Sequence, residues 1–148
     1  MPNVILWQAA WLSRSTVLTT QLNSLANAAR SAAGTEIDNS VNQDQYGILE
    51  VLVTFGTAPS AGAYLQIHMV TAPNATNYED GSDTVDPGIH TAVATIPVKA
   101  LTSAQRVVST MIQLKPGKTK FLLLNQSGQA FPASGSTVTL YTTNDEVQ

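Results

Sequence analysis

Four carboxylates gather in one short stretch of the chain, and their types and spacing come closest to a chemical site. They lie in the string EDGSDTVD and are Glu79, Asp80, Asp83 and Asp86. Carboxylate oxygens are the hard ligands that calcium prefers. The spacing, however, does not match the D-x-D-x-D-G calcium loop, and the bidentate glutamate that ends such a loop is missing. The alternative to a calcium site in this acidic loop is a solvated surface loop in which Tyr78 packs down and the carboxylates face water.

The remaining titratable residues form no catalytic pattern. A zinc pair of His68 and His90 would need a carboxylate from the acidic loop, and we expect His68 instead to be an outward-facing strand residue. Glu50 stands alone, and a glycosidase pair would have to draw its second member from Glu79 or Asp80. The chain has no cysteine, and it has no nucleophile elbow, H-E-x-x-H, Walker or dinucleotide motif. The sequence therefore predicts no enzyme, no catalytic residue, no cofactor, no small-molecule substrate and no metal site, with calcium at the acidic loop left open.

Two apolar segments between Tyr46 and Val70 show the alternation of half-buried strands. In the first segment the apolar face holds Leu49, Val51, Val53 and Phe55. In the second, Leu65, Ile67 and Met69 share the apolar face, and Tyr64, Gln66 and His68 share the opposite one. Thr57 to Gly62 supplies turn residues between the two segments. This pattern predicts an antiparallel strand pair with one face in the core.

Further strand-like segments follow without any alternating helices. They are His90–Ala100, Arg106–Leu114, Thr119–Asn125 and Thr137–Thr143. The string Lys-Pro-Gly-Lys at 115–118 predicts a tight turn, so we expect 119–125 to return as the partner strand of 106–114. Many short strands with Gly and Pro turns are typical of a jelly roll. We predict a mainly β fold, a two-layer antiparallel β-sandwich over residues 46–143 that is jelly-roll-like.

The first third of the chain has a different pattern. Residues 1–17 read as an N-terminal arm or strand that carries Trp7 and Trp11. Apolar residues then recur at spacings of three and four, at Leu18, Leu22, Leu25, Ala26 and Ala29, and Gly34 ends the pattern. This predicts one amphipathic helix over residues 18–33. At 148 residues, we expect 1–148 to form a single domain.

The low content of charged residues indicates which kinds of partner the protein can bind. Only 11% of residues are charged and the net charge is −3, which argues against nucleic acid because phosphate binding needs clustered Lys and Arg. No signal peptide or membrane-spanning stretch is expected. A sparsely charged surface suits a protein packed against neighbours. We therefore predict a homodimer or homotrimer, with an interface formed by Val4, Ile5, Leu6, Trp7, Trp11, Leu22 and Ala26.

Several strings resemble a family of small tailed-bacteriophage virion proteins. They are STVLTTQLNSLANAARSAAGTEIDN, VTFGTAPSAGAYLQIHMV, TNYEDG, IPVKALTSAQRV and LKPGKTKFLLLNQSGQAFPASGSTVTLY, and they lie between Ser15 and Tyr141. Related chains look like capsid decoration, or cement, proteins with a jelly-roll-like fold. The resemblance implies a structural role in the virion and no catalytic residues.

Three functions follow as hypotheses. The first is a capsid decoration protein on the virion surface, made in the host cytoplasm, which stabilises the head through contacts with itself and the major capsid protein. The alternative is a tail- or fibre-associated host-recognition module that binds carbohydrate on exposed aromatic rings, for which Tyr64, Tyr78 and Tyr141 are the candidates. The third is an enzyme that uses the acidic loop.

Overall fold

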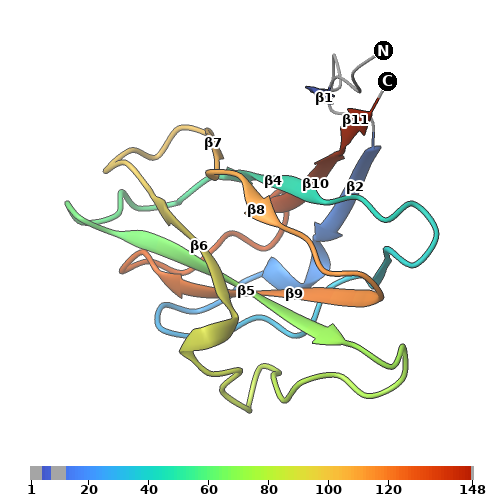
Figure 1. Cartoon of the computed structure of the whole chain (residues 1–148). Helices are drawn as coiled ribbons and strands as arrows, with labels where there is room; N and C mark the ends of the chain where they lie inside the picture. The colour runs from blue at the N-terminus through green and yellow to red at the C-terminus, as the bar shows by residue number, and fades with distance from the viewer. Residues whose placement is uncertain (1–4, 8–12, 148) are drawn as a thin grey trace.

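The computed structural model describes residues 5–7 and 13–147, and these form a β-sandwich of antiparallel sheets (Figure 1). The five-stranded sheet contains β2 (Ser13–Leu18), β10 (Thr137–Thr143), β4 (Tyr46–Val53), β7 (Gln105–Val108) and β8 (Ile112–Gln113). The four-stranded sheet contains β3 (Ile37–Asp38), β9 (Lys118–Gln126), β5 (Tyr64–Ala72) and β6 (Ala92–Pro97). The mainly β, two-layer fold predicted from the sequence is confirmed.

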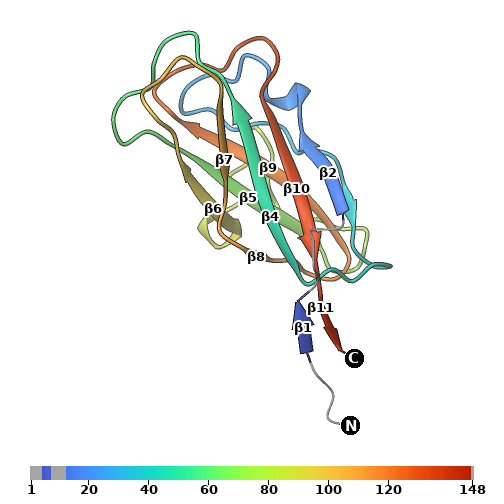
Figure 2. The same cartoon turned by 90° about the horizontal axis from the view of Figure 1, so that it is seen from above.

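Two smaller features complete the chain. The strands β1 (Ile5–Trp7) and β11 (Asp145–Val147) pair with each other and extend away from one end of the sandwich (Figure 2). Two single-turn 3-10 helices, η1 (Thr20–Leu22) and η2 (Ile89–Thr91), lie in connections between strands. Among the described residues, no helix is long and apolar enough to cross a membrane.

The core lies between the two sheets because alternating side chains of facing strands point inward. The inward positions that alternation predicted are buried: Leu49, Val51 and Val53 on β4, and Leu65, Ile67 and Met69 on β5. Phe55 and Phe131 meet edge to face at one end, with ring centroids 5.6 Å apart. This geometry is the favoured one for an aromatic pair.

The expected pairing of the two central strands is wrong. β4 pairs with β10, β7 and β8, whereas β5 pairs with β9 and β6 in the other sheet. The strand that follows the 115–118 turn likewise joins the opposite sheet from β7 and β8. Alternation identifies which face of a strand is buried. It does not show whether two strands are neighbours in one sheet or face each other across the core, because both arrangements bury that face. The connections therefore cross between layers, as in a jelly roll.

The expected helix over 18–33 is also wrong. Apart from Leu18 at the end of β2 and from η1, this segment is irregular and runs along the edge of β9 beyond the short pairing with β3. Ala28, Ser31 and Gly34 donate their backbone N–H groups to carbonyls of β9 at 2.7–2.9 Å. Leu22 and Leu25 still face the core. The edge of β9 supplies hydrogen bonds that an isolated helix would have made internally, so tertiary contacts override the local periodicity.

A long connection from Pro73 to Gly88 folds over the outer face of the four-stranded sheet. Gly81 lies so close to this sheet that a β carbon there would come within 2.9 Å of the Val70 side chain. At Gly88 the backbone has a φ of 75°, a conformation that favours glycine, and the chain turns there into η2. This connection, with η2, positions the residues of both sites described below.

Candidate functional site

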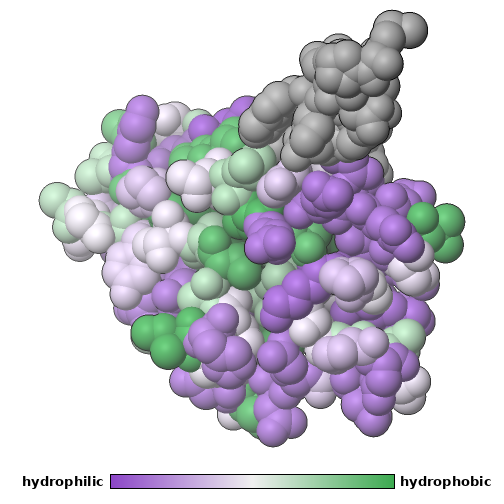
Figure 3. Space-filling model, viewed as in Figure 1, coloured by the Kyte–Doolittle hydropathy of each residue, from purple (hydrophilic) through white to green (hydrophobic). Residues whose placement is uncertain are grey.

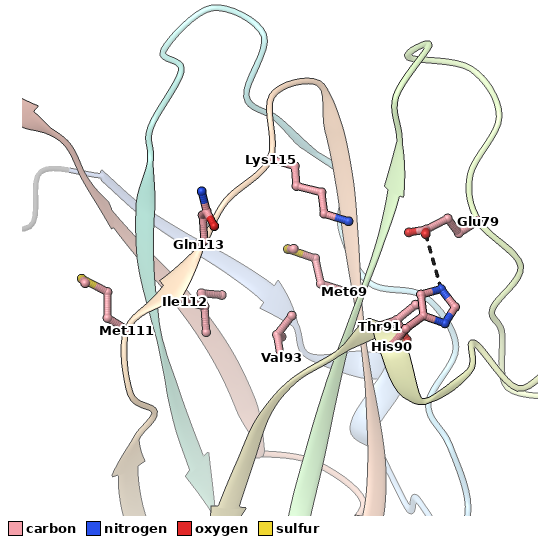
Figure 4. Close-up of a pocket in the computed structure, with 9 residues that line it drawn as sticks. All are labelled: Met69, Glu79, His90, Thr91, Val93, Met111, Ile112, Gln113 and Lys115. Carbon is pink, nitrogen blue, oxygen red and sulfur yellow. Dashed lines mark ion pairs between the residues drawn. The ribbon is translucent and has the colours of Figure 1, made fainter.

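Two hollows flank the short strand β8 at one edge of the sandwich, and Gln113 lines both of them. The first, which we name the edge groove, has a volume of about 330 Å³ and is lined by Met69, Glu79, His90, Thr91, Val93, Met111, Ile112, Gln113 and Lys115 (Figure 4). The second, the amide hollow, has a volume of about 450 Å³ and is lined by Asn39, Gln43, Asp44, Gln45, Tyr46, Gln113, Leu114 and Pro116. Both volumes lie within the range of small-molecule sites.

The edge groove has an apolar floor and a polar rim. Met69 and Ile112 are 4% and 5% exposed and close its floor from the two facing sheets. Figure 4 shows Glu79 and His90 on one side, Gln113 on the other, and Lys115 extending between them. Figure 3 shows hydrophobic residues in the middle of this face, over β6 and β8, with hydrophilic residues around them. The groove therefore offers an apolar surface bordered by hydrogen-bonding groups.

Glu79 is held by its neighbours as a carboxylate. Its Oε2 accepts hydrogen bonds from Thr71 Oγ1 at 2.9 Å and Thr71 N at 3.1 Å. Its Oε1 lies 3.6 Å from His90 Nε2. Burial by itself raises the pKa of Glu79, but the hydrogen bonds from Thr71 and the nearby charge of Lys115 outweigh it, so the pKa lies below its usual value. Glu79 is thus an ionised hydrogen-bond acceptor at neutral pH.

The amide hollow is built on one buried asparagine. Asn39 is 5% exposed; its Nδ2 donates to Asp44 O at 2.8 Å and Lys115 O at 3.2 Å, and its Oδ1 accepts from Asp44 N at 2.8 Å. This fixes the loop that carries Gln43 and Gln45, whose side chains are exposed. Each glutamine amide offers two donors and an acceptor without net charge. The half-buried Tyr46 ring, at the start of β4, adds an apolar surface.

The carboxylates of the acidic loop do not converge. Glu79 turns toward Thr71 and the edge groove, whereas Asp86 lies 3.4 Å from Arg30 Nη2. No group of three or more His, Cys, Asp or Glu side chains is arranged to hold a metal ion within the part of the chain that the structure describes. The calcium reading of this loop therefore finds no support in its geometry.

The two histidines lie in different places. His90 lines the edge groove and its side chain is 71% exposed. His68 points away from the core, as expected, but it is only 4% exposed because the 73–88 connection covers it. The strand pattern thus predicted the outward position of His68, but it gave no sign that a connection covers this face. Burial, and then the nearby charge of Arg30, lower the pKa of His68.

The three candidate tyrosines do not form one platform. Tyr64 is 39% exposed on β5. The Tyr78 hydroxyl donates to Glu36, and Lys120 Nζ lies 4.4 Å from the ring centroid; burial and the Glu36 hydrogen bond raise the pKa of Tyr78 to about 12. Tyr141 lies on β10 in the other sheet. The ring that does line a hollow, Tyr46, was not among the candidates, and the string NQDQ at 42–45 just before it was the available signal.

Glu50 has no catalytic partner in this arrangement. It lies on β4 in the five-stranded sheet and binds Arg106, with Oε1 2.7 Å from Nη1. The acidic residues proposed as its second member follow β5 of the other sheet.

The predicted interface residues are scattered. Val4 and Trp11 lie outside the described residues, and Ile5, Leu6 and Trp7 form β1 against β11. Leu22 is fully buried in the core of its own sandwich, and Ala26 is exposed. Self-association stays a prediction.

Comparison with known proteins gives structural neighbours only. No protein-family model and no curated protein matches the chain. Similar solved structures include "CBM35 from Cellvibrio japonicus Abf62" (14% identity, 99% of this chain and 96% of that chain, TM-score 0.46). A Xyl-CBM35 in complex with a glucuronic acid containing disaccharide has 13% identity, covers 98% of this chain and 96% of that chain, and has a TM-score of 0.46. CsCBM6-3 from Clostridium stercorarium in complex with cellobiose has 14% identity, coverage of 97% and 92%, and a TM-score of 0.41.

The first functional hypothesis, a capsid decoration protein, finds no support among these neighbours. The neighbours named here are carbohydrate-binding modules, the class of protein named in the alternative hypothesis. Because TM-scores below 0.5 carry no argument about function, the proposal that follows depends on the residues of the site.

Proposed function

We propose that this chain is a non-catalytic carbohydrate-binding module whose ligand lies along β8, across the amide hollow and the edge groove. The observation that carries the proposal is that Gln113 lines both hollows, so they meet at one amide side chain. A sugar chain presents hydroxyl groups around its ring edges and apolar C–H groups on its ring faces. The site offers both kinds of partner side by side.

The amide hollow suits the hydroxyl groups of a neutral sugar. Gln43, Gln45 and Gln113 are exposed at its surface, and each can donate and accept at once. Asn39 is held by three hydrogen bonds, so the loop is fixed before a ligand arrives. A fixed loop loses less conformational entropy on binding.

The edge groove suits a sugar ring face. Met69, Val93 and Ile112 give an apolar floor, and Glu79 Oε1 and Gln113 stand at its rim. Binding rather than hydrolysis follows from the acid–base chemistry: Glu79 is the only carboxylate among the described residues that line the groove, and its pKa is lowered. A glycosidase needs a second carboxylate and a general acid with a raised pKa.

The test is a glycan array with the purified chain, followed by titration calorimetry of any neutral glycan that binds. We expect saturable binding that Gln113→Ala weakens about tenfold, because it removes hydrogen bonds in both hollows. The matched control is Gln126→Ala on β9, outside both hollows, which should bind like the unaltered chain. Absence of any glycan binding, or equal effects of the two variants, would refute the proposal.

A further inference from the structure

A separate small pocket lies on the outer face of the four-stranded sheet. Its volume is about 190 Å³, and it is lined by Arg30, Gln66, His68, Asp86, Ile89 and Leu124. Gln66 and His68 are successive outward positions on β5, and Leu124 on β9 lies opposite Gln66. Arg30 bridges to Leu124 from the segment beside β9. Three adjacent segments of backbone thus place these side chains on one patch, which we name the outer pocket.

Two buried nitrogens of the outer pocket have no partner. Neither His68 Nε2 nor Arg30 Nε makes a hydrogen bond to the described residues, and each is inaccessible to solvent. Buried polar atoms in folded proteins nearly always have a partner, and leaving one unsatisfied is costly. Both residues line the same pocket.

The hydrogen-bond network fixes the character of His68. Thr91 donates its single hydroxyl proton to Gly88 O at 2.8 Å. Thr91 Oγ1 therefore accepts the bond from His68 Nδ1, which is 2.9 Å away. These two contacts assign the proton of the neutral ring to Nδ1 and leave Nε2 as an acceptor. Of the two unpartnered nitrogens, Arg30 Nε is therefore a donor and His68 Nε2 an acceptor, and Gln66 and Asp86 add further polar groups to the lining.

The charges around the pocket select a neutral ligand. Arg30 already lies 3.4 Å from Asp86 Oδ1 and donates to Val85 O at 3.1 Å. A metal cation on His68 would meet the Arg30 charge. An anion would meet the Asp86 carboxylate and the lone pair of His68 Nε2. A hydroxyl group, which accepts from one nitrogen and donates to the other, satisfies both without adding charge.

The pocket also has room for more than a bridging water. A water molecule occupies about 30 Å³ in the liquid, well below the pocket volume of about 190 Å³. Leu124 and Ile89 supply apolar walls, and Ile89 is 86% exposed at the rim. We propose that the outer pocket binds a small neutral polyol, a monosaccharide ring or cyclitol, with one hydroxyl group bridging Arg30 Nε and His68 Nε2.

The test reads His68 directly. Nitrogen-15 NMR of the ring follows Nε2 while the full chain is titrated with glucose, galactose, mannose or myo-inositol. We expect a saturable shift of the Nε2 resonance with at least one of these polyols. Arg30→Met should weaken that binding at least tenfold, because it removes the donor of a pair in a buried site. A titration without any saturable shift leaves only a bridging water in the pocket and overturns the proposal.

Two further variants test whether the polyol binds in the outer pocket or along β8. Ile89→Trp places a larger ring at an exposed position of the rim, where folding is not at stake, and should block the polyol. Gln113→Ala, in the site along β8, should leave the His68 shift intact. A shift lost in Gln113→Ala but kept in Ile89→Trp would assign the binding to β8 and refute the outer pocket. Failure of glycans to bind along β8 would leave this titration readable, because it reports on the His68 ring alone.

Discussion

One segment of the chain, residues 79–91, forms a wall of two sites with opposite physical character. Glu79 and His90 on this segment face the edge groove, and Asp86 and Ile89 face the outer pocket. Each site holds a histidine, but His90 is 71% exposed at the side chain whereas His68 is 4% exposed overall. Water screens the charges of the first site, whereas the His68 ring in the second is shielded from water by the residues that cover it.

This contrast shows how burial changes what a polar residue contributes. In the edge groove, His90 and Glu79 lie 3.6 Å apart in contact with solvent, so their attraction adds little stability. In the outer pocket, the His68 ring is buried and neutral, and its acceptor Nε2 has no hydrogen-bond partner. An acceptor left unsatisfied in a buried position costs free energy. The two sites should therefore respond differently to substitution and to pH.

The largest expected effect comes from a substitution at Asn125, which should destabilise the surroundings of the outer pocket and leave the edge groove unchanged. Asn125 is fully buried and ties the segment that carries Arg30 to β9. Its Nδ2 donates to three carbonyls at 2.8–3.1 Å, those of Leu25, Ala26 and Gln129. Asn125→Ala should lower the free energy of unfolding by about 2–4 kcal/mol, because it removes these bonds and takes away Asn125 Oδ1, which accepts from the buried Ser127 N at 3.1 Å. Urea denaturation measures this loss.

The control for this change is another asparagine. Asn77 lies exposed in the 73–88 connection, and Asn77→Ala should change the free energy of unfolding by less than about 0.5 kcal/mol. The Asn125 variant should also alter the His68 ring resonances and leave binding along β8 unchanged in the absence of urea. Equal stability losses in the two variants would contradict the anchoring role of Asn125.

The next effect is the dependence of stability on pH. The pKa of His68 in the folded chain is lowered from about 6.5 by burial and by Arg30, with Asp86 acting in the opposite direction. As the pH falls below 6.5, the unfolded chain binds a proton at His68 that the folded chain does not, so stability decreases. The free energy of unfolding should therefore fall between pH 7 and about pH 5, above the range where carboxylates titrate. In His68→Gln this decrease should be smaller.

A neighbouring residue on the same strand supplies the comparison for the pH experiment. Gln66→Ala also alters the outer pocket but removes no titratable group, so it should keep the slope of the unaltered chain. If His68→Gln and the unaltered chain show the same slope between pH 5 and pH 7, the ring is not excluded from water as the structure describes.

The sequence predicted what is decided locally. Tyr46–Val53, Tyr64–Ala72 and Thr137–Thr143 are strands where alternation placed them, because side-chain period depends on the backbone of one segment. Pairing depends on segments far apart in sequence, so the partners of β4 and β5 were wrong. The 18–33 segment failed for the same reason, since the free edge of β9 supplied its hydrogen bonds.

The sites were harder to predict than the strands. The amide hollow brings Asn39 and Gln113 together from positions more than seventy residues apart, and no spacing rule connects them. His68 follows the outward face of its strand, as alternation indicated, but only the long 73–88 connection buries it. Exposure on an outer sheet face is decided by what covers that face, and irregular connections carry no periodic signal.

The smallest expected effect is that of a substitution at His90, which is exposed at the edge groove. His90→Ala removes the contact between the His90 ring and Glu79, but Thr71 continues to hold that carboxylate through two hydrogen bonds. The free energy of unfolding at pH 7 should change by no more than about 0.5 kcal/mol, since a solvated pair contributes little. Urea denaturation of His90→Ala beside the unaltered chain checks this, and added salt should leave the small difference unchanged or reduce it further. A loss of 2 kcal/mol or more would show that the groove residues are as strongly coupled as those of the outer pocket, and the contrast between an open site and a buried one would not hold.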